Sequence, residues 1–314
     1  MPLFTRVSSI LRHGYSKNKI YASGGSVVVG GDRTFHVFIS PGTFEVTYPS
    51  EFIGGVECLI VAGGGGSVVG GGGGGGGGMR VITSQVSENS SYPISVGSGG
   101  IANPSPTLRG GTGGPSSAFG FTSAGGGGGG RHGIWNGTID NIRPGYPGGP
   151  GGSGGGGGGA YAFAVPSFNT ASGGTGGPGN TPPVSPPQGS SGSPGDGATG
   201  SSTPYSDSGG GGGAGGSGSS QNGGSGRLLP PNFPVADIGP LFGSTWQTVV
   251  GTYGLSRGGN GTNPLGVIPT TVPNVSAPTM DNTGYGGHAQ PQAFYGASGL
   301  VIVSYSNTAG ITTL

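Results

Sequence analysis

The chain has 314 residues, 83 of which are Gly and 27 Pro, with 7% charged residues and a formal net charge of +1. This near-neutral balance excludes a polyanion as the main partner, so we expect no nucleic-acid binding. Cys58 is the only cysteine, which excludes disulfides within the chain and thiolate zinc sites. It lies in an apolar run, so we expect a buried, unreactive thiol.

Residues 1–32 read as a mixed N-terminal lead-in or docking segment. Four of the basic residues lie there without a nearby acid: Arg6, Arg12, Lys17 and Lys19. They suit either a docking tail for an acidic surface or a solvated terminus. This stretch lacks the apolar core of a signal peptide, and no segment reaches the ~20 apolar residues of a membrane span. We therefore expect synthesis in a host cytoplasm and no membrane insertion.

The strongest strand pattern covers residues 33–48. Two alternating apolar runs, 35–39 and 44–48, flank a Pro-Gly turn at residues 40–43, which predicts a β-hairpin with one buried face and His36 on its polar face. Further strands are expected at 56–62, which is apolar throughout and so central, and then at 80–86, 92–96 and 300–305. No helical periodicity is visible. Because 300–305 has no partner nearby in sequence, we expect it to join the N-terminal strands in one sheet.

Glycine runs fill the region between the terminal strands, residues 97–299, after two earlier runs at 63–66 and 70–78. They favour one of two structures: flexible linkers, or polyglycine II helices with three residues per turn that hydrogen bond to one another. Their purity, their number and the strands at both ends of the array favour polyglycine II. We select as structural glycines Gly70, Gly74, Gly78, Gly125 and Gly130.

The sequence offers no catalytic constellation. The four His are scattered, and the ten acidic residues are dispersed singly, without the paired carboxylates or clustered ligands of catalytic or metal sites. We expect no enzyme activity, no metal and no cofactor.

Aromatic residues gather in two loops, 131–146 and 228–253. Aromatic side chains in loops are typical of binding surfaces, since they offer a large, rigid contact area. Our receptor-contact candidates are Trp135, Tyr146, Trp246 and Tyr253. The alternative is that these side chains fill gaps in a glycine slab.

The order of motifs resembles the glycine-rich domain proteins of tailed bacteriophages and some aquatic bacteria. The matching pieces are residues 34–48, 56–66, 92–100, 116–130 and 296–305. The resemblance implies a virion context: a tail fibre, a fibre tip or a capsid accessory protein. A looser architectural parallel is the adhesin that caps some long tail fibres, in which polyglycine II helices carry recognition loops.

The expected fold is all-β, with a β-sheet platform from both chain ends supporting a bundle of polyglycine II helices with long irregular loops. Residues 33–314 would form this glycine-rich domain. The expected function is a bacteriophage virion structural protein at a tail fibre or tail extremity, with a role in host-surface recognition. Its partners would be other virion proteins in a homo-oligomeric or multi-protein assembly, and a host saccharide or outer-membrane protein. The alternatives are a purely architectural capsid decoration, head fibre or tail adaptor, and a bacterial surface or matrix protein.

Overall fold

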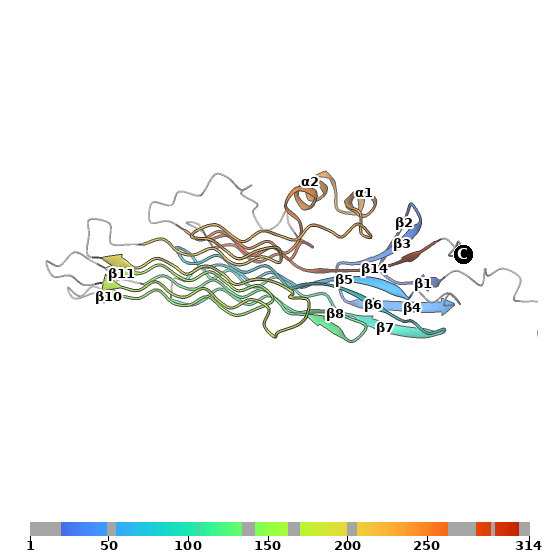
Figure 1. Ribbon diagram of the computed structural model, residues 1–314, viewed down its shortest axis with the longest axis horizontal. Coiled ribbons are helices and arrows are strands. Elements are labelled where there is room, and N and C mark those ends of the chain that lie inside the picture. The colour runs from blue at the N-terminus through green and yellow to red at the C-terminus, as the bar shows by residue number, and fades with distance from the viewer. Residues whose placement is uncertain are drawn as a thin grey trace, which may run out of the picture.

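A computed structural model describes residues 20–48, 55–105, 107–133, 142–162, 170–199, 206–262, 281–289 and 293–307. The molecule is elongated, with β-sheets and helices at one end and long glycine-rich backbone segments running from them to the other end (Figure 1). Most of its regular elements are strands in antiparallel sheets. The expected all-β class is therefore right.

The central layer is a five-stranded antiparallel sheet of order β2-β3-β14-β5-β6. Its strands are β2 (Ser26–Gly30), β3 (Arg33–Phe38), β14 (Leu300–Ser306), β5 (Val56–Val61) and β6 (Met79–Ser84). β14 lies between β3 and β5 and pairs with both, so Ile302 is opposite Val37 on one side and Leu59 on the other. The prediction that the two ends of the chain meet in one sheet is confirmed.

A second sheet packs on one face of the first. It has the order β1-β4-β7 and contains β1 (Tyr21–Ser23), β4 (Gly42–Tyr48) and β7 (Ser90–Ile94). A short hairpin of β8 (Ser116–Ala118) and β9 (Phe121–Ser123) lies beside it. β1 and β2 both come from the second half of the segment that we predicted as a lead-in.

The predicted hairpin over residues 33–48 is wrong in its pairing, although both of its strands exist. β3 pairs with β2 and β14, and β4 pairs with β1 and β7, in different sheets. The expected turn is instead the corner at which the chain crosses between sheets, and Phe38 and Phe44 from its two sides enter the same core. A two-stranded ribbon would bury only one face, whereas β3 is buried on both.

Because β3 is buried on both faces, His36 does not lie on a polar face. Its side chain is fully buried between the sheets, with the ring of Phe44 edge-on at 5.1 Å. Nδ1 lies 2.8 Å from the carbonyl oxygen of Gly24, and Nε2 lies 3.0 Å from the hydroxyl of Tyr305. A carbonyl can only accept, so Nδ1–H donates and Nε2 accepts from Tyr305. Burial lowers the pKa of His36, against the opposing effect of the Gly24 hydrogen bond.

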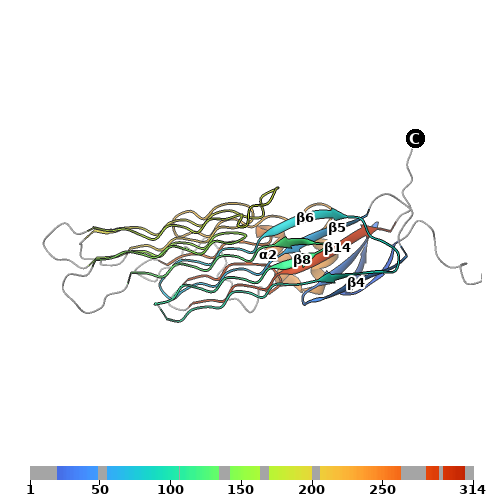
Figure 2. The same ribbon diagram turned by 90° about the horizontal axis from the view of Figure 1, so that it is seen from below.

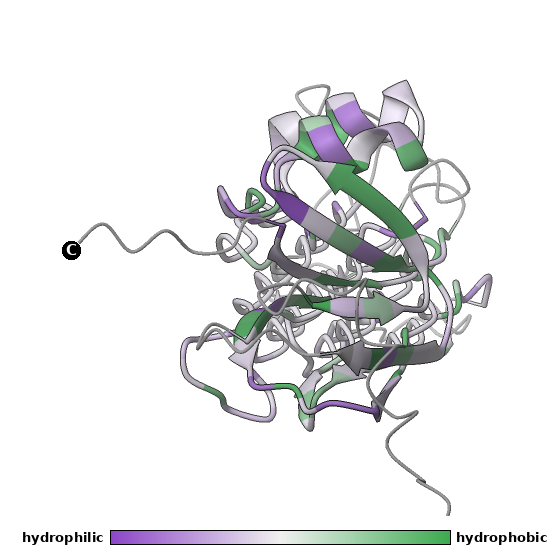
Figure 3. Cartoon of the chain, turned by 90° about the vertical axis from the view of Figure 1, so that its right-hand side faces the viewer, coloured by the Kyte–Doolittle hydropathy of each residue, from purple (hydrophilic) through white to green (hydrophobic). Residues whose placement is uncertain are grey.

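Two apolar cores lie on the two faces of the five-stranded sheet. Phe44, Cys58 and Val303 belong to the core between the sheets. Burial raises the pKa of the Cys58 thiol, as expected for an unreactive cysteine. Phe35, Leu59 and Ile302 belong to the other core, which helices cover. Figure 3 looks at this end, with the helices above the sheets and green, hydrophobic stretches along the strands.

The helices are α1 (Val235–Ile238), a 3₁₀ turn η1 (Gly239–Leu241) and α2 (Ser244–Tyr253). The expectation of no helix is wrong for this segment. Glycines with positive φ lie at both ends of α2, Gly243 at 89° and Gly254 at 74°, where other residues would be strained. Between them, Trp246, Val249 and Val250 are buried at helical spacing.

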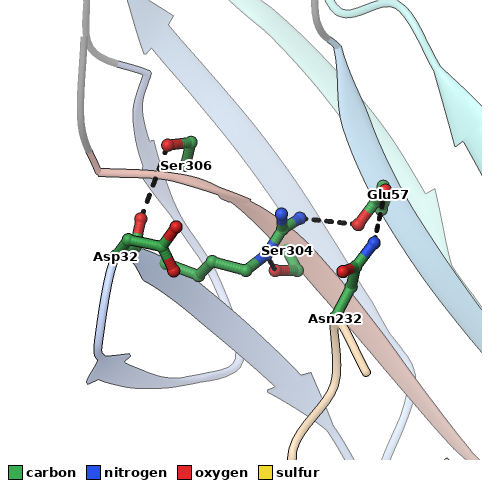
Figure 4. A network of polar contacts seen from close by, with 6 residues as sticks. Asp32, Glu57, Asn232, Ser304 and Ser306 are labelled. Carbon is green, nitrogen blue, oxygen red and sulfur yellow. Dashed lines mark hydrogen bonds and ion pairs between the residues drawn. The ribbon is translucent and has the colours of Figure 1, made fainter. Parts of the chain in front are cut away.

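A polar network ties the chain ends to the helical layer (Figure 4). Arg33 on β3 contacts Glu57 on β5 at 2.7 Å and donates from Nε to Ser304 on β14, also at 2.7 Å. Asn232, shortly before α1, donates to the other oxygen of Glu57 at 3.0 Å. One ion pair thus joins three strands and the segment that leads into the helices.

Candidate functional site

The glycine array comprises the backbone segments that run side by side along the long axis from the sheets (Figure 2). Its main segments are 62–67, 71–78, 97–101, 110–114, 124–133, 145–150, 154–160, 172–178, 189–195, 206–214, 223–226, 256–262, 284–289 and 293–299. Their connection to the sheets is direct. β5 continues into segment 62–67, and segment 71–78 continues into β6.

Backbone hydrogen bonds in the array repeat every third residue. In segment 62–67, the N–H groups of residues 62 and 65 donate to segment 71–78. Those of residues 63 and 66 donate to segment 110–114, and those of residues 64 and 67 donate to segment 293–299. The N···O distances are between 2.8 and 3.0 Å. One segment therefore binds three different neighbours in rotation, whereas a β-strand binds neighbours on two sides only.

Segment 71–78 follows the same rule. The N–H groups of residues 72, 75 and 78 donate to segment 124–133, and those of residues 74 and 77 donate to segment 284–289. The N–H groups of residues 73 and 76 donate to segment 206–214. Every N–H from 71 to 78 has a backbone acceptor, which satisfies the requirement that buried backbone groups be paired.

Close packing explains why these segments consist of glycine. A Cβ added at Gly74 would lie 2.0 Å from the carbonyl oxygen of Gly65, and one at Gly125 would lie 1.8 Å from that of Gly113. The corresponding distance is 2.4 Å at Gly78, to Oε1 of Gln188, and 2.2 Å at Gly130, to the carbonyl oxygen of Tyr146. At Gly74, Gly125 and Gly130, any other residue would push the neighbouring backbone segment away, and at Gly78 it would displace the Gln188 side chain.

Gly70 differs from the other selected glycines. A Cβ there would meet nothing within 4 Å, and its φ is +68°. It lies in the turn before segment 71–78. Its requirement for glycine comes from backbone conformation and not from packing.

The tip is the end of the array farthest from the main sheets, where Figure 1 shows β10 and β11. It contains the short pairs β10 (Ile142–Arg143) with β11 (Tyr161–Ala162) and β12 (Thr170–Ala171) with β13 (Ala198–Thr199). Ala160, Ala162, Ala171 and Ala198 form a small apolar cluster there. These strand pairs join the ends of the glycine segments that lead to and from the tip.

Tyr146 lies next to the tip and is 42% exposed. Its N–H donates to the carbonyl oxygen of Arg131 at 3.0 Å, and its own carbonyl accepts from Gly158 at 2.9 Å. The guanidinium carbon of Arg131 lies 3.3 Å from the centroid of the tyrosine ring. The array thus fixes both backbones, and the two side chains stack as a cation–π pair.

Two of the other candidates, Trp246 and Tyr253, lie at the helical end of the molecule, away from Tyr146. Trp246 is only 3% exposed and stacks on Phe242 at 4.3 Å, inside the core under α2. Tyr253, at the end of the same helix, is half-buried against Val249, Tyr285 and Ala297. Trp135 lies outside the described residues.

The spacing of the buried residues in α2 is a signal that sequence analysis missed. Residues 246, 249, 250 and 253 follow the i, i+3, i+4, i+7 pattern of a helix face. Glycines bound the segment at both ends. Read in this way, Trp246 becomes a core residue rather than a loop residue.

The histidines of the array are buried and bound to backbone groups. His132 contacts the carbonyl oxygens of Gly133 and Ser206 at 2.7 and 3.1 Å. His288 accepts from the N–H of Asn260 at 3.1 Å, and burial, together with nearby Arg257, lowers its pKa to about 4. Within the described ranges, no three His, Cys, Asp or Glu side chains gather as metal ligands would.

Among the described residues, neither length nor hydropathy qualifies any helix to cross a bilayer. No curated protein matches the sequence of this chain. The glycine-rich domain family matches residues 39–229, which is more than half of the chain and covers β4 to β13 together with most of the glycine array. The chain therefore belongs to the glycine-rich domain family.

Proposed function

We propose that this protein is a structural component of a bacteriophage particle, located at a tail fibre or another tail extremity, that takes part in recognising the host surface. The observation that carries the proposal is the separation of two ends. Ile20 and Asn307, at the two described ends of the chain, line the same small pocket beside the sheets. The exposed Tyr146 follows three residues after β10, which lies at the far end of the array (Figure 1). Such a molecule would attach by one end and present the other.

We also infer that the glycine segments are polyglycine II helices. The rotation of hydrogen-bond partners with a period of three supports this, because that helix has three residues per turn. Each such helix lacks internal hydrogen bonds, so its pairing depends on neighbours. The bundle would then act as a stiff spacer between the attachment end and the tip.

Specificity in this proposal resides in side chains at the tip. Polyglycine offers only N–H and C=O groups, which cannot distinguish ligands by side-chain chemistry. The Arg131–Tyr146 pair offers an aromatic face with an adjacent cation, both held by backbone hydrogen bonds. Tyr and Arg are enriched among residues that dominate binding energy. A saccharide or an outer-membrane protein of the host would suit this surface.

The test is adsorption of particles that carry Tyr146→Ala. Loss of a binding aromatic costs at least ~2 kcal/mol, so adsorption should fall more than about tenfold while the protein is still incorporated. Tyr146→Phe, which keeps the ring, should retain most adsorption. Ile39→Ala is the control, because Ile39 is 53% exposed directly after β3, at the sheet end and outside the pocket that Ile20 and Asn307 line.

The competing function is purely architectural, with no receptor. The burial of Trp246 supports this alternative, because it gives that residue a packing role rather than a binding role. Under this alternative, particles with Tyr146→Ala would adsorb like the parent at normal incorporation. Substituting Trp135 as well would cover the other candidate from the predicted loop 131–146. Unchanged adsorption by the double variant would reject host recognition through these aromatics.

A further inference from the structure

One edge of the five-stranded sheet has unpaired backbone groups. Among the strands that the structure describes, β6 pairs with β5 alone. The N–H of Met79 points away from β5, since it donates to the carbonyl oxygen of Gln188 at 2.9 Å. Backbone direction alternates along a strand in an antiparallel pair. Val81 and Thr83 therefore also direct their N–H and C=O groups away from β5, and neither residue has a backbone partner on that side in the part of the chain that the structure describes.

A groove of about 300 Å³ follows this edge. Residues 79–83 line it, together with Phe121, Ser185, Pro186 and Arg227. Successive side chains of a strand point to opposite faces. A groove lined by five consecutive residues must therefore run along the backbone edge, and not over one face of the sheet. The unpaired groups of Val81 and Thr83 thus border an open space.

Two guanidinium groups flank this groove. Arg80 donates to the carbonyl oxygen of Thr122 at 2.9 Å, and its guanidinium carbon lies 5.4 Å from the ring centroid of Phe121. Arg227 donates to the carbonyl oxygens of Ala214 and Pro187, at 2.8 and 3.1 Å. Carbonyls orient the guanidinium groups without neutralising them. Neither arginine contacts a carboxylate among the described residues.

The two cations lie on opposite faces of the sheet. Arg80 shares a face of β6 with Ile82, which packs against the core between the sheets. Arg227 contacts Ala214 and also donates to the carbonyl oxygen of Met79 at 3.5 Å, and both of these residues belong to the core under the helices. A strand added to β6 would place its alternating side chains beside one cation and then the other.

We propose that the open edge of β6 is a strand-addition site for an extended segment of a partner protein that carries acidic side chains. Hydrogen bonds to Val81 and Thr83 would supply affinity for the backbone, as in other strand additions. Arg80 and Arg227 would select acidic side chains on the two faces of the added strand. The site lies on the sheets and not at the tip, so it does not depend on the proposed function.

The probe is a short, fluorescein-labelled peptide rich in Val, Thr and Glu, with the same peptide carrying Lys in place of Glu as its counterpart. Binding is followed by fluorescence anisotropy. The acidic peptide should bind, and the Lys peptide should not. Arg80→Gln should weaken binding about tenfold, because one charge-assisted contact is lost.

Val81→Pro tests the backbone contact. Proline removes an N–H that points away from β5, so the β5–β6 pairing is kept, as in natural edge strands. Val81→Pro should abolish binding, whereas the matched Val81→Thr, which keeps the N–H, should retain it. The acidic peptide N-methylated at alternate residues should fail to bind the unaltered protein, which repeats the test without any change to the fold. Bound peptide should also slow amide exchange at Val81 and Thr83.

Several outcomes would overturn the proposal. Equal binding of the acidic and Lys peptides would remove the charge selectivity. Binding unaffected by both Val81→Pro and N-methylation would remove the strand addition. Tighter binding of an acidic oligosaccharide than of the peptide would make the groove an anion site. Self-association of the protein that Val81→Pro abolishes would make a second copy the occupant.

Discussion

At the scale of single residues, the array depends on the absence of a side chain at particular positions. Gly70 and Gly74 belong to the same run of glycines and look equivalent in the sequence. Their surroundings differ: a Cβ at Gly74 would lie 2.0 Å from a carbonyl oxygen, whereas one at Gly70 would meet nothing. The purity of the run predicts close packing, but the place where a run turns depends on its neighbours in space.

We expect Gly74→Leu to be strongly destabilising. Its side chain would separate segments 62–67, 71–78 and 284–289, and each backbone group left unpaired would cost ~1–3 kcal/mol of stability. Gly251→Leu is the matched control, because a Cβ there meets nothing within 4 Å and the residue lies within α2. Chemical denaturation of both variants makes the comparison. Equal stability of Gly74→Leu and the parent would refute close packing at this position.

At the scale of elements, local patterns predicted strands better than they predicted partners. The alternation in residues 33–48 identifies β3 and β4, but it cannot show that β14, far away in sequence, takes the edge of β3. The pairing is decided by burial on both faces of β3, which requires a layer on each side. The helix α2 was missed because its apolar pattern extends over only 10 residues within a segment rich in Pro and Gly.

Burial changes what is expected of Trp246. Trp246→Ala would leave a cavity between α2 and the five-stranded sheet and should cost about 3–5 kcal/mol of stability. Trp246→Phe, which keeps an aromatic ring against Phe242, should cost less. Thermal denaturation of the purified protein measures both effects. An unchanged melting temperature for Trp246→Ala would contradict the core position and return Trp246 to the receptor-contact candidates.

At the scale of the whole molecule, the sequence indicates which regions are sheet and which are glycine array, because strand patterns concentrate at the two chain ends. It also indicates that the ends meet, since residues 300–305 have no local partner. It cannot indicate which glycine segments are neighbours. Segment 62–67 forms hydrogen bonds with residues between 75 and 297, and glycines carry no side-chain pattern from which such contacts could be read.

The array has few side chains, so its stability should depend on the sheets that hold its segments in place. β5 and β6 continue directly into segments 62–67 and 71–78. We therefore expect the sheets and the array to unfold as one cooperative unit. Ile302→Ala, in the core under the helices, should cost about 2–5 kcal/mol. Amide exchange of residues 72–78 should then accelerate at least about 30-fold, since ~1.4 kcal/mol is one decade.

Measurement of exchange on uniformly ¹⁵N-labelled protein tests this cooperativity. The acceleration at residues 72–78 should match that at amides of β5, because global unfolding would expose both together. Ile39→Ala is the matched control, since Ile39 is 53% exposed and should leave both regions unchanged. If Ile302→Ala accelerates β5 but leaves residues 72–78 protected, the glycine array is stable on its own. The sheets would then serve for attachment and not for holding the array together.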